Sequence, residues 1–353
     1  LHRLIRRQRQ MCIRDRSLPE PSQIPKVEGI YCDWTASLSL DMLIKEAQET
    51  INLVTDLDSR VKTISGGLGL SIWETGIVNS LGVEGLQKGT AAALSIFAVA
   101  EEAGVQTSGF EFQRERSFKK IDLDHVAKGA VKSAIAQLKP SKINAGDYEV
   151  LLDPIAVSML LSTTFARAIC ADNVQDKRSF LTGKLGQEIA TPSLTIVDDA
   201  LIPGGLSSRR FDGEGVPSQR LTVVDKGILA SYLYNTYTAQ REGRDSTGHA
   251  ARNYSSEPSV APTNLVLKTR EVKRKERLLD EVEKGLLIRW VIGAHTANPI
   301  TGEFSVALGE AYYVEKGEIK FPVKQAMAGG NVQQLLKDID CAGDDVRNMP
   351  PFI

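Results

Sequence analysis

Residues 283–323, EKGLLIRWVIGAHTANPITGEFSVALGEAYYVEKGEIKFPV, decide the fold of the C-terminal half of this chain. Two of its runs, LLIRWVIG (286–293) and EFSVALGEAYYVE (303–315), have the character of strands. The turn at 315–317 suits a three-residue hairpin loop with glycine in the left-handed position, and the same pattern recurs at 225–227. Together these features predict a β-rich domain.

The segments around this block add further strands and a few helices. Residues 148–152 (YEVLL) read as a buried strand, and Asp153-Pro154 is typical of a helix start, with an N-cap acid and a proline in the first turn. That helix is expected to run through IAVSMLLSTTFARAIC (155–170). Gly285 is expected to close a short helix, and 331–340 to form a last one. The other predicted strands are SLTIVDD (193–199), LTVVDKGILASYL (221–233) and NLVLK (264–268).

The N-terminal part has a different pattern, in which helices alternate with glycine-rich β segments. Residues 122–138 have a helical apolar face that Pro140 ends. An earlier amphipathic helix is predicted over 37–51, with its apolar stripe at Leu40, Leu43, Ile44, Ala47 and Ile51. Short strands are predicted at 60–64, 68–73 and 76–80, followed by a longer one at 90–100 and another at 104–116, with glycine turns between them. The fold class is therefore α+β, an antiparallel sheet with helices followed by a β-rich C-terminal domain.

Charge and composition suggest how the chain is divided. Residues 1–16 contain six arginines and a single aspartate, so the remainder carries a net charge of −6 although the whole chain carries −1. We expect 1–16 to be a non-native extension, because the segment lacks the marks of a signal or transit peptide. The proline and small polar residues at 139–146 predict a boundary. This gives an N-terminal α+β domain over 17–146, truncated at its start, and a C-terminal β-rich domain over 147–353.

Composition also limits the class of protein. With 42% hydrophobic and 25% charged residues in 353, the chain is expected to be globular and soluble rather than disordered. No apolar run is long enough for a membrane span, and the four cysteines show no CxxC spacing. These observations predict a cytoplasmic protein that does not bind membranes.

Two polar loops hold the candidate functional residues. The first, 201–220, brings Arg209, Asp212 and Glu214 between glycines, where the carboxylates could bind a metal or act as acid and base. The alternative is a solvated turn in which Asp212 caps backbone amides and Arg209 or Arg210 neutralises it. The second loop, 241–253, holds Ser246, Thr247, His249 and Arg252. A Ser/His nucleophile pair competes there with a structural or peptide-binding loop, which is favoured because no GxSxG motif is present.

The histidines give weak support for a metal site. None of the four has a partner three or four residues away that would place two ligands on one helix face. A zinc site built from His249, His295 and a distant cysteine remains geometrically open. Cys341 is expected to be a packed thiol.

Eight segments, taken in order, carry a resemblance to a known family over about residues 27–350. They are GIVNSLGVEG (76–85), VLLDPIAVSMLL (150–161), RRFDGEGVPSQ (209–219), KGILASYLYNTYTAQREG (226–243), STGHAAR (246–252), TNLVL (263–267), the opening block (283–323) and AGGNVQQLLKDIDCAGDDV (328–346). In these segments the chain resembles the TldD/PmbA family, known as zinc metallopeptidases or modulators of DNA gyrase.

The resemblance also shows where the chain departs from the catalytic branch. Members of the TldD branch carry a HExxxH motif, whose histidines bind zinc and whose glutamate is the general base. Here the aligned residues are Ser162-Thr163-Thr164-Phe165-Ala166-Arg167. Ser162 and Arg167 replace the two histidines and Thr163 the glutamate, and none of them can take over these roles. The chain therefore looks like the PmbA (TldE) branch.

Membership of that branch implies a subunit without its own catalytic residues, metal or cofactor. Its expected partner is a TldD-like catalytic subunit that holds the zinc in a heterodimeric peptidase acting on small or unfolded peptides. Arg209, Asp212, Glu214, His249 and Arg252 are then candidates for lining a shared substrate chamber.

Two other functions stay open at this stage. A self-sufficient hydrolase could use Asp212 and Glu214, or His249, in a different site. A DNA-gyrase or nucleic-acid-associated regulator is disfavoured by the net charge of −6 outside residues 1–16. Its strongest basic run, KTREVKRKER (268–277), has the composition of a solvated face.

Overall fold

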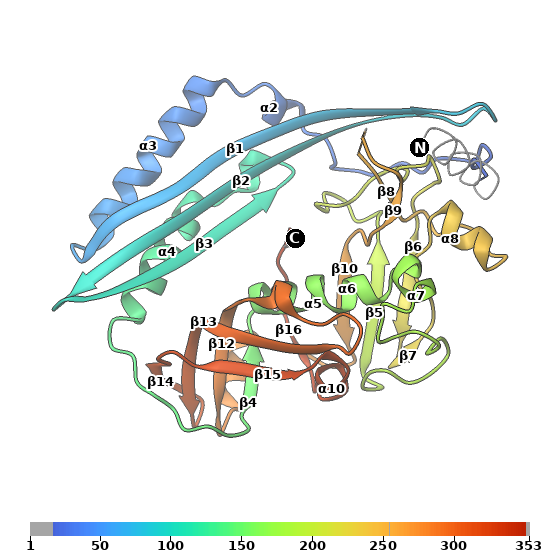
Figure 1. Ribbon diagram of the computed structural model, residues 1–353. Helices are drawn as coiled ribbons and strands as arrows, with labels where there is room; N and C mark the ends of the chain where they lie inside the picture. Colours follow the sequence, from blue (N-terminus) through green and yellow to red (C-terminus); the bar gives the residue numbers. More distant parts are fainter. Residues whose placement is uncertain (1–16, 254, 351–353) are drawn as a thin grey trace, which may run out of the picture.

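The computed structural model describes residues 17–253 and 255–350. As predicted, an antiparallel sheet with helices precedes a β-rich part (Figure 1). Among the described residues, no helix combines the length and the hydropathy needed for a membrane span.

The N-terminal sheet consists of three long strands, β1 (Val61–Val78), β2 (Glu84–Glu102) and β3 (Val105–Glu115), in the order β1-β2-β3. The strands predicted at 90–100 and 104–116 are found within β2 and β3. The prediction of three short strands at 60–64, 68–73 and 76–80 was wrong, because these runs form one strand that pairs with β2 along its whole length. Glycines 66, 67, 69, 76, 85 and 89 lie inside strands, and only Gly82 and Gly104 lie in the connecting turns, with positive φ. The continuous ladder offsets the weak strand preference of glycine.

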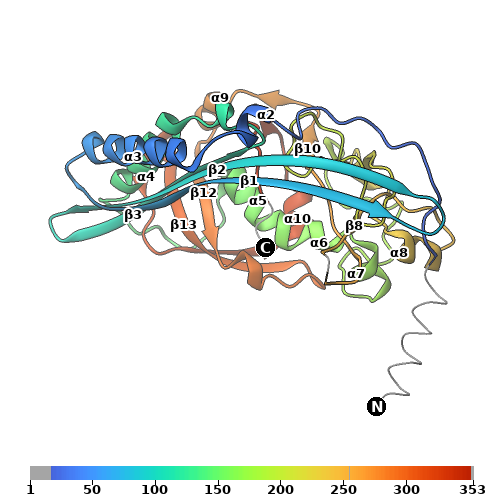
Figure 2. The same cartoon turned by 90° about the horizontal axis from the view of Figure 1, so that it is seen from above.

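Two long helices cover one face of this sheet, α3 (Leu40–Leu57) and α4 (Leu123–Ala136), with α2 (Asp33–Ala36) and the 3-10 turn η1 (Phe118–Lys120) nearby. The prediction of α4 is confirmed, with Asp122 as its N-cap and a buried apolar face against β2 and β3. In Figure 2, α3 and α4 run beside one another along the sheet.

Only part of the predicted apolar stripe of α3 faces the core: Leu43 packs against it and Ala47 is half-buried. Leu40, Ile44 and Ile51 are 71%, 57% and 48% exposed, whereas Thr50 and Val54 are buried. Thr50 can be buried because its hydroxyl donates to the Glu46 carbonyl. The pattern of apolar residues located the helix, but the positions of α4 and β1 determine which side it buries.

One C-terminal sheet has the order β14-β13-β12-β4, with β15 (Met327–Asn331) also paired to β13. Its strands are β4 (Glu149–Leu152), β12 (Lys284–Ile292), β13 (Glu303–Glu315) and β14 (Glu318–Pro322). Gly285 lies inside β12 rather than at a helix end, and a Cβ there would lie 2.6 Å from the Glu149 carbonyl oxygen. The preceding helix, α9 (Lys275–Asp280), ends earlier.

The second C-terminal sheet has the order β10-β5-β6-β7, formed by β10 (Leu265–Thr269), β5 (Leu194–Asp199), β6 (Arg220–Asp225) and β7 (Ile228–Leu229). Its hairpin loop has two residues, Lys226 and Gly227, and both have positive φ. The β13–β14 loop is built in the same way. The predicted three-residue loops are therefore corrected to two residues, a length that matches the strand twist when both residues are left-handed.

The helix after β4 is interrupted, contrary to the prediction of one helix through residue 170. It starts with Asp153 as N-cap and forms α5 (Pro154–Thr163), then breaks at Thr164 before α6 (Phe165–Ala168) and α7 (Ala171–Gln175). The hydroxyl of Thr164 donates to the Leu160 carbonyl, and that of Thr163 lies 2.9 Å from the Ala294 carbonyl oxygen. Hydroxyl groups that bond to helix carbonyls favour bends of this kind.

The remaining elements are short. They are α8 (Thr236–Arg241), α10 (Val332–Lys337), the 3-10 turn η2 (Ala294–Thr296), and the two-stranded pairs β8 (Ala250–Ala251) with β9 (Ser259–Val260) and β11 (Val272–Lys273) with β16 (Ala342–Gly343). The prediction of a last helix within 331–340 is confirmed by α10.

A buried ionic cluster joins the N-terminal sheet to the C-terminal part. Arg289 of β12 lies 2.9 Å from a carboxylate oxygen of Glu111 in β3 and 3.2 Å from one of Glu310 in β13. Arg347 also pairs with Glu111, at 2.8 Å. Ser133 of α4 donates to Glu310. Both carboxylates are thus balanced by cations and hydrogen bonds, as buried charges require.

Replacing Arg289 with alanine should destabilise the protein by about 3–5 kcal/mol, because Glu310 and Glu111 would then be buried with fewer cationic partners. The free energy of urea unfolding measures this loss. The control Arg178→Ala removes an exposed ion pair with Asp176 and should cost less than about 1 kcal/mol. Equal losses in the two variants would contradict the role given to the cluster.

Acid should weaken the same cluster. Burial raises the pKa of Glu111, but Arg347 and Arg289 outweigh it, and the pKa lies below its ordinary value of 4.5. A carboxyl with a lowered pKa contributes stability that is complete above the unfolded pKa and is lost as pH falls through the folded one. The urea midpoint should therefore drop as pH falls below about 4.5. Glu111→Gln should flatten this drop; an unchanged slope would rule Glu111 out as its source.

Candidate functional site

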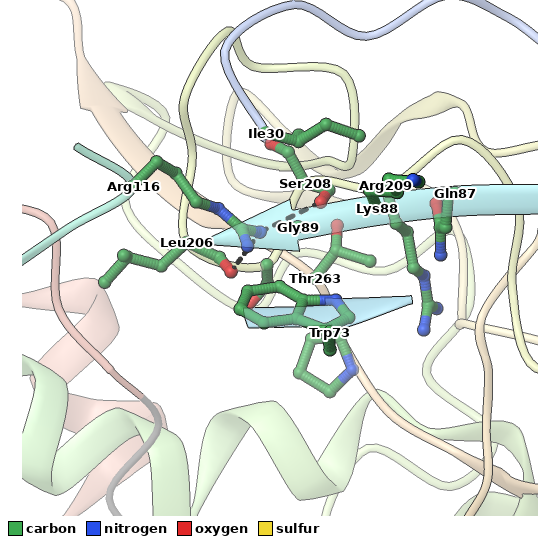
Figure 3. Close-up of a pocket in the computed structure, with 12 residues that line it drawn as sticks. Ile30, Trp73, Gln87, Lys88, Gly89, Arg116, Leu206, Ser208, Arg209 and Thr263 are labelled. Atoms are coloured by element: carbon green, nitrogen blue, oxygen red, sulfur yellow. Dashed lines mark hydrogen bonds between the residues drawn. The ribbon is translucent and has the colours of Figure 1, made fainter. Parts of the chain in front are cut away.

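The β1–β2 hairpin passes over the loops of the C-terminal part (Figure 1). A cavity of about 280 Å³ lies between them (Figure 3). The hairpin contributes Trp73, Gln87, Lys88 and Gly89, and the end of β3 is followed by Arg116. The other lining residues are Ile30, Leu206, Ser207, Ser208, Arg209, Pro262 and Thr263. The cavity thus draws on both parts of the chain.

Arg116 ties the hairpin to the loop 201–220. Its side chain is 5% exposed and donates to the carbonyls of Thr90, Gly205, Leu206 and Ser208, and Figure 3 shows the last two of these bonds. The guanidinium also lies 4.9 Å from the centre of the Trp73 ring. Burial, with a smaller effect of Arg114, lowers the pKa of Arg116 to about 10. The group is therefore a desolvated cation that remains charged at neutral pH.

Arg209 lines the same cavity and is the one predicted site residue that does so. Its Nη2 donates to the Gly248 carbonyl at 3.3 Å, while its Nε is buried without a hydrogen-bond partner among the described residues. Burial lowers the pKa of Arg209, against the attraction of Asp212 and Asp198. Most of its hydrogen-bonding capacity is consequently unused within the described part of the chain.

Asp212 joins the two polar loops through backbone hydrogen bonds. Its carboxylate accepts from the N–H groups of Glu214 and Val216 in its own loop and from that of Ala250 in the other. The side chain is buried, and this burial raises its pKa despite the three donors. The sequence also allows the alternative in which Asp212 caps backbone amides in a solvated turn. Asp212 does cap backbone amides, but it does so inside the protein.

Arg210, the other candidate to neutralise Asp212, is used elsewhere. Its guanidinium donates to the carbonyls of Pro25 and Leu86. It therefore fixes the N-terminal segment and the hairpin against the loop.

His249 is buried in a chain of hydrogen bonds. Its Nε2 lies 3.0 Å from the Asp198 carboxylate and its Nδ1 lies 2.8 Å from the Thr247 hydroxyl. Ser246 interacts with the Tyr234 carbonyl and the Gly248 N–H, not with the imidazole. The proposed Ser/His pair is therefore not formed, and both ring nitrogens of His249 serve to hold the loop.

The last two loop candidates lie at the edge of this region. Glu214 accepts from the backbone N–H of Thr236 at the start of α8. Arg252 is exposed, next to Gly213 of the other loop. The structure thus gathers the five predicted chamber residues in two contacting loops, with only Arg209 reaching the cavity.

The helix positions that the sequence resemblance aligns with HExxxH carry side chains that do not suit a zinc ion. Thr163 donates to the Ala294 carbonyl, Arg167 is exposed, and Ser162 offers a neutral hydroxyl. Across the described ranges no three His, Cys, Asp or Glu side chains group in a way that could hold a metal, so His249 and His295 do not share such a site. Cys341 is partly buried, and burial raises the pKa of its thiol.

Several cavity residues could not be found from sequence motifs. Trp73 faces Gly89 across the β1–β2 ladder, and a Cβ on residue 89 would lie 2.3 Å from the indole. Arg116 ends a strand run that has no recognisable motif. The paired tryptophan and glycine would have been a usable signal only if the strand register had been known.

The comparisons with known proteins agree with this architecture. Residues 145–353 match the PmbA/TldA metallopeptidase C-terminal domain, and residues 35–138 match the PmbA/TldA metallopeptidase central domain. An uncharacterized protein of Methanocaldococcus jannaschii is 38% identical over 90% of this chain and 73% of its own length. The chain belongs to the PmbA/TldD metallopeptidase family. This confirms the resemblance drawn from the eight sequence segments.

Solved structures of the family share the fold. A Thermotoga maritima protein described as a candidate modulator of a DNA gyrase superposes with a TM-score of 0.89 at 30% identity, covering 96% of this chain and 77% of its own. TldE from Thermococcus kodakarensis gives 0.88 at 26% identity, covering 96% and 76%. The chain spans 57% of a curated metalloprotease of Methanothermobacter thermautotrophicus, at 31% identity over 73% of this chain.

Asp212→Asn should destabilise the protein by about 1–3 kcal/mol, because the new amide would point a donor at the N–H of Ala250 or of its own loop. Hydrogen exchange should show faster opening of residues 246–252. The matched control is Asp225→Asn in the exposed β6–β7 turn, which should leave both measurements near wild type. Unchanged exchange in Asp212→Asn would contradict the role of this carboxylate as the link between the loops.

Proposed function

We propose that this chain is a PmbA/TldE-like, non-catalytic subunit of a metallopeptidase complex that acts on small or unfolded peptides. The observation that carries the proposal is the chemistry at Ser162, Thr163 and Arg167, where the catalytic branch has its metal ligands and base. A serine or threonine hydroxyl is a poor zinc ligand, and a protonated guanidinium is none. The similarity to a structure named TldE supports the same branch.

In this proposal a TldD-like partner supplies the zinc and the general base. This chain then contributes binding surface to the complex rather than reacting groups. The two contacting loops and the cavity beside them are the part we assign to a shared peptide chamber. Arg209 is the candidate residue best placed to meet a peptide there, because its side chain lines the cavity.

The geometry gives little support to a self-sufficient hydrolase. A general base needs an accessible lone pair near the substrate. The Asp212 carboxylate already accepts hydrogen bonds from three backbone amides. His249 is buried, and both of its ring nitrogens are hydrogen-bonded. The nucleic-acid alternative is weakened as well. In its basic run, Lys273 lies 2.7 Å from Glu281, and Lys275 lies 3.0 Å from Asp345, which reduces the free positive charge.

Purified alone, the chain should bind no stoichiometric zinc and cleave no peptide. Co-expression with a paralogue that carries an intact HExxxH should give a complex that co-purifies, contains zinc and cleaves unfolded peptides. Elemental analysis and a peptide-cleavage assay measure these outcomes. Chelator-sensitive cleavage by the isolated chain would sink the proposal.

A pair of variants in the complex locates the chemistry. Glu→Gln in the partner's HExxxH should abolish cleavage, because the general base is lost. Arg167→Gln in this chain should leave cleavage within about twofold, since its exposed side chain contacts no reacting group in this proposal. If Arg167→Gln also abolishes cleavage while the complex stays intact, this chain has a catalytic role, and the proposal of a non-catalytic subunit is wrong.

A further inference from the structure

The charges around the cavity are unbalanced. Lys88, Arg116 and Arg209 line it, and no acidic residue does. Lys88 is exposed, and its ammonium nitrogen lies 3.5 Å from a carboxylate oxygen of Glu74. Water and this carboxylate therefore already compensate its charge. The two arginines differ, because among the described residues neither makes a direct ion pair with a carboxylate, although Asp212 and Asp198 attract Arg209 from farther away.

Arg116 is buried, and Arg209 is half-buried with its Nε atom out of contact with water. Arg116 uses most of its donors on backbone carbonyls, which orient it but do not neutralise its charge. Arg209 keeps a buried Nε without a partner, and a single hydrogen bond from Nη2. A desolvated cation whose charge is at most partly compensated is unfavourable, and a bound anion offsets that cost. Arginine suits this purpose because its planar fork matches a carboxylate or phosphate.

Part of the remaining wall is apolar. Trp73, Ile30, Leu206 and Pro262 supply this part, beside the polar side chains of Gln87, Ser207, Ser208 and Thr263, and Figure 3 shows the Trp73 indole below Thr263 and near Arg116. The indole is fixed between the Arg116 guanidinium and the bare backbone of Gly89. The volume of about 280 Å³ lies at the lower end of small-ligand sites. It therefore suits one residue at the end of a chain better than a whole cofactor.

We propose that this cavity binds the C-terminal residue of a peptide, with its free carboxylate at Arg209 and Arg116 and its side chain against Trp73. Inorganic phosphate would satisfy the cations but leave the indole and proline walls without a partner. A carboxylate that carries an apolar side chain uses both halves of the cavity. The peptide as the source of this carboxylate rests on the proposed function, whereas the anion site itself rests on the cavity.

The experiment titrates the isolated full chain with Ala-Ala-Phe, with its C-terminal amide and with inorganic phosphate. Calorimetry gives the affinities, and tryptophan fluorescence reports on Trp73. The free acid should bind at least about tenfold more tightly than the amide, as expected when a charge-assisted hydrogen bond is lost. Equal affinity for acid and amide would overturn the proposal, and so would phosphate binding without peptide binding.

Two variants and a control test the residues. Arg209→Gln should weaken binding of the free acid by at least about tenfold and remove most of its preference over the amide. Arg220→Gln, an exposed cation at the start of β6, should change neither. If Arg209→Gln fails to fold, Trp73→Ala carries the test, because it should weaken acid and amide together and abolish the fluorescence response. Undiminished binding in the folded variants would reject the site.

This assay needs no partner, so its failure can be told apart from failure of the proposed function. No preference for the acid, with normal formation of the zinc-containing complex, rejects the cavity assignment alone. A clear acid preference in a chain that forms no complex rejects the subunit role alone.

Discussion

The ion cluster around Arg289 is the constraint on which the rest of the structure depends. It fixes β3 and α4 against β12 and β13 through Glu111, Glu310 and Ser133. Because β3 pairs with β2, and β2 with β1, the cluster also sets the direction in which the long hairpin leaves the sheet. The hairpin then reaches the C-terminal loops (Figure 2), and its residues Trp73, Gln87, Lys88 and Gly89 line one side of the cavity. A buried charge pair adds little net stability compared with apolar packing, but it specifies one geometry because mispairing is costly.

Polar side chains that look catalytic in the sequence serve here to hold backbone. Asp212 and His249 are of the residue types found in acid–base sites. Asp212, however, accepts hydrogen bonds from backbone N–H groups, and His249 is hydrogen-bonded to a threonine hydroxyl and a buried aspartate. Loops rich in glycine have few side chains with which to stabilise each other, so a buried carboxylate that accepts three amides is an efficient support. Among the described residues of this region, the buried polar atoms without a hydrogen-bond partner are the Nε of Arg209 and the hydroxyls of Ser218 and Thr236. This favours ligand binding over proton transfer in this part of the chain.

Much of the fold could be predicted from the sequence, because several segments carry strong local signals. The periodicity of α4 and the strand runs of β12 and β13 gave the correct elements. Predictions failed where tertiary contacts outweigh local preference: glycines in β1 are held by a ladder, and α3 buries Thr50 and Val54 rather than Leu40 and Ile44. In the site, loop composition pointed to Arg209, but Arg116 and Trp73 come from strands that pair far from it in sequence. Nothing local could connect these residues.

The register of the hairpin links the fold to the site. Trp73 pairs with Gly89, and only glycine leaves room for the indole to lie across the neighbouring strand. A shift of one residue would turn Trp73 to the opposite face and place a side chain where the ring now lies. Trp290 also lies over a glycine, Gly309 of β13, although its partner in the ladder is Glu310. The cavity wall is therefore specified by a glycine on one strand as much as by the tryptophan on the other, and a change at residue 89 would act on the cavity without touching any charged group in it.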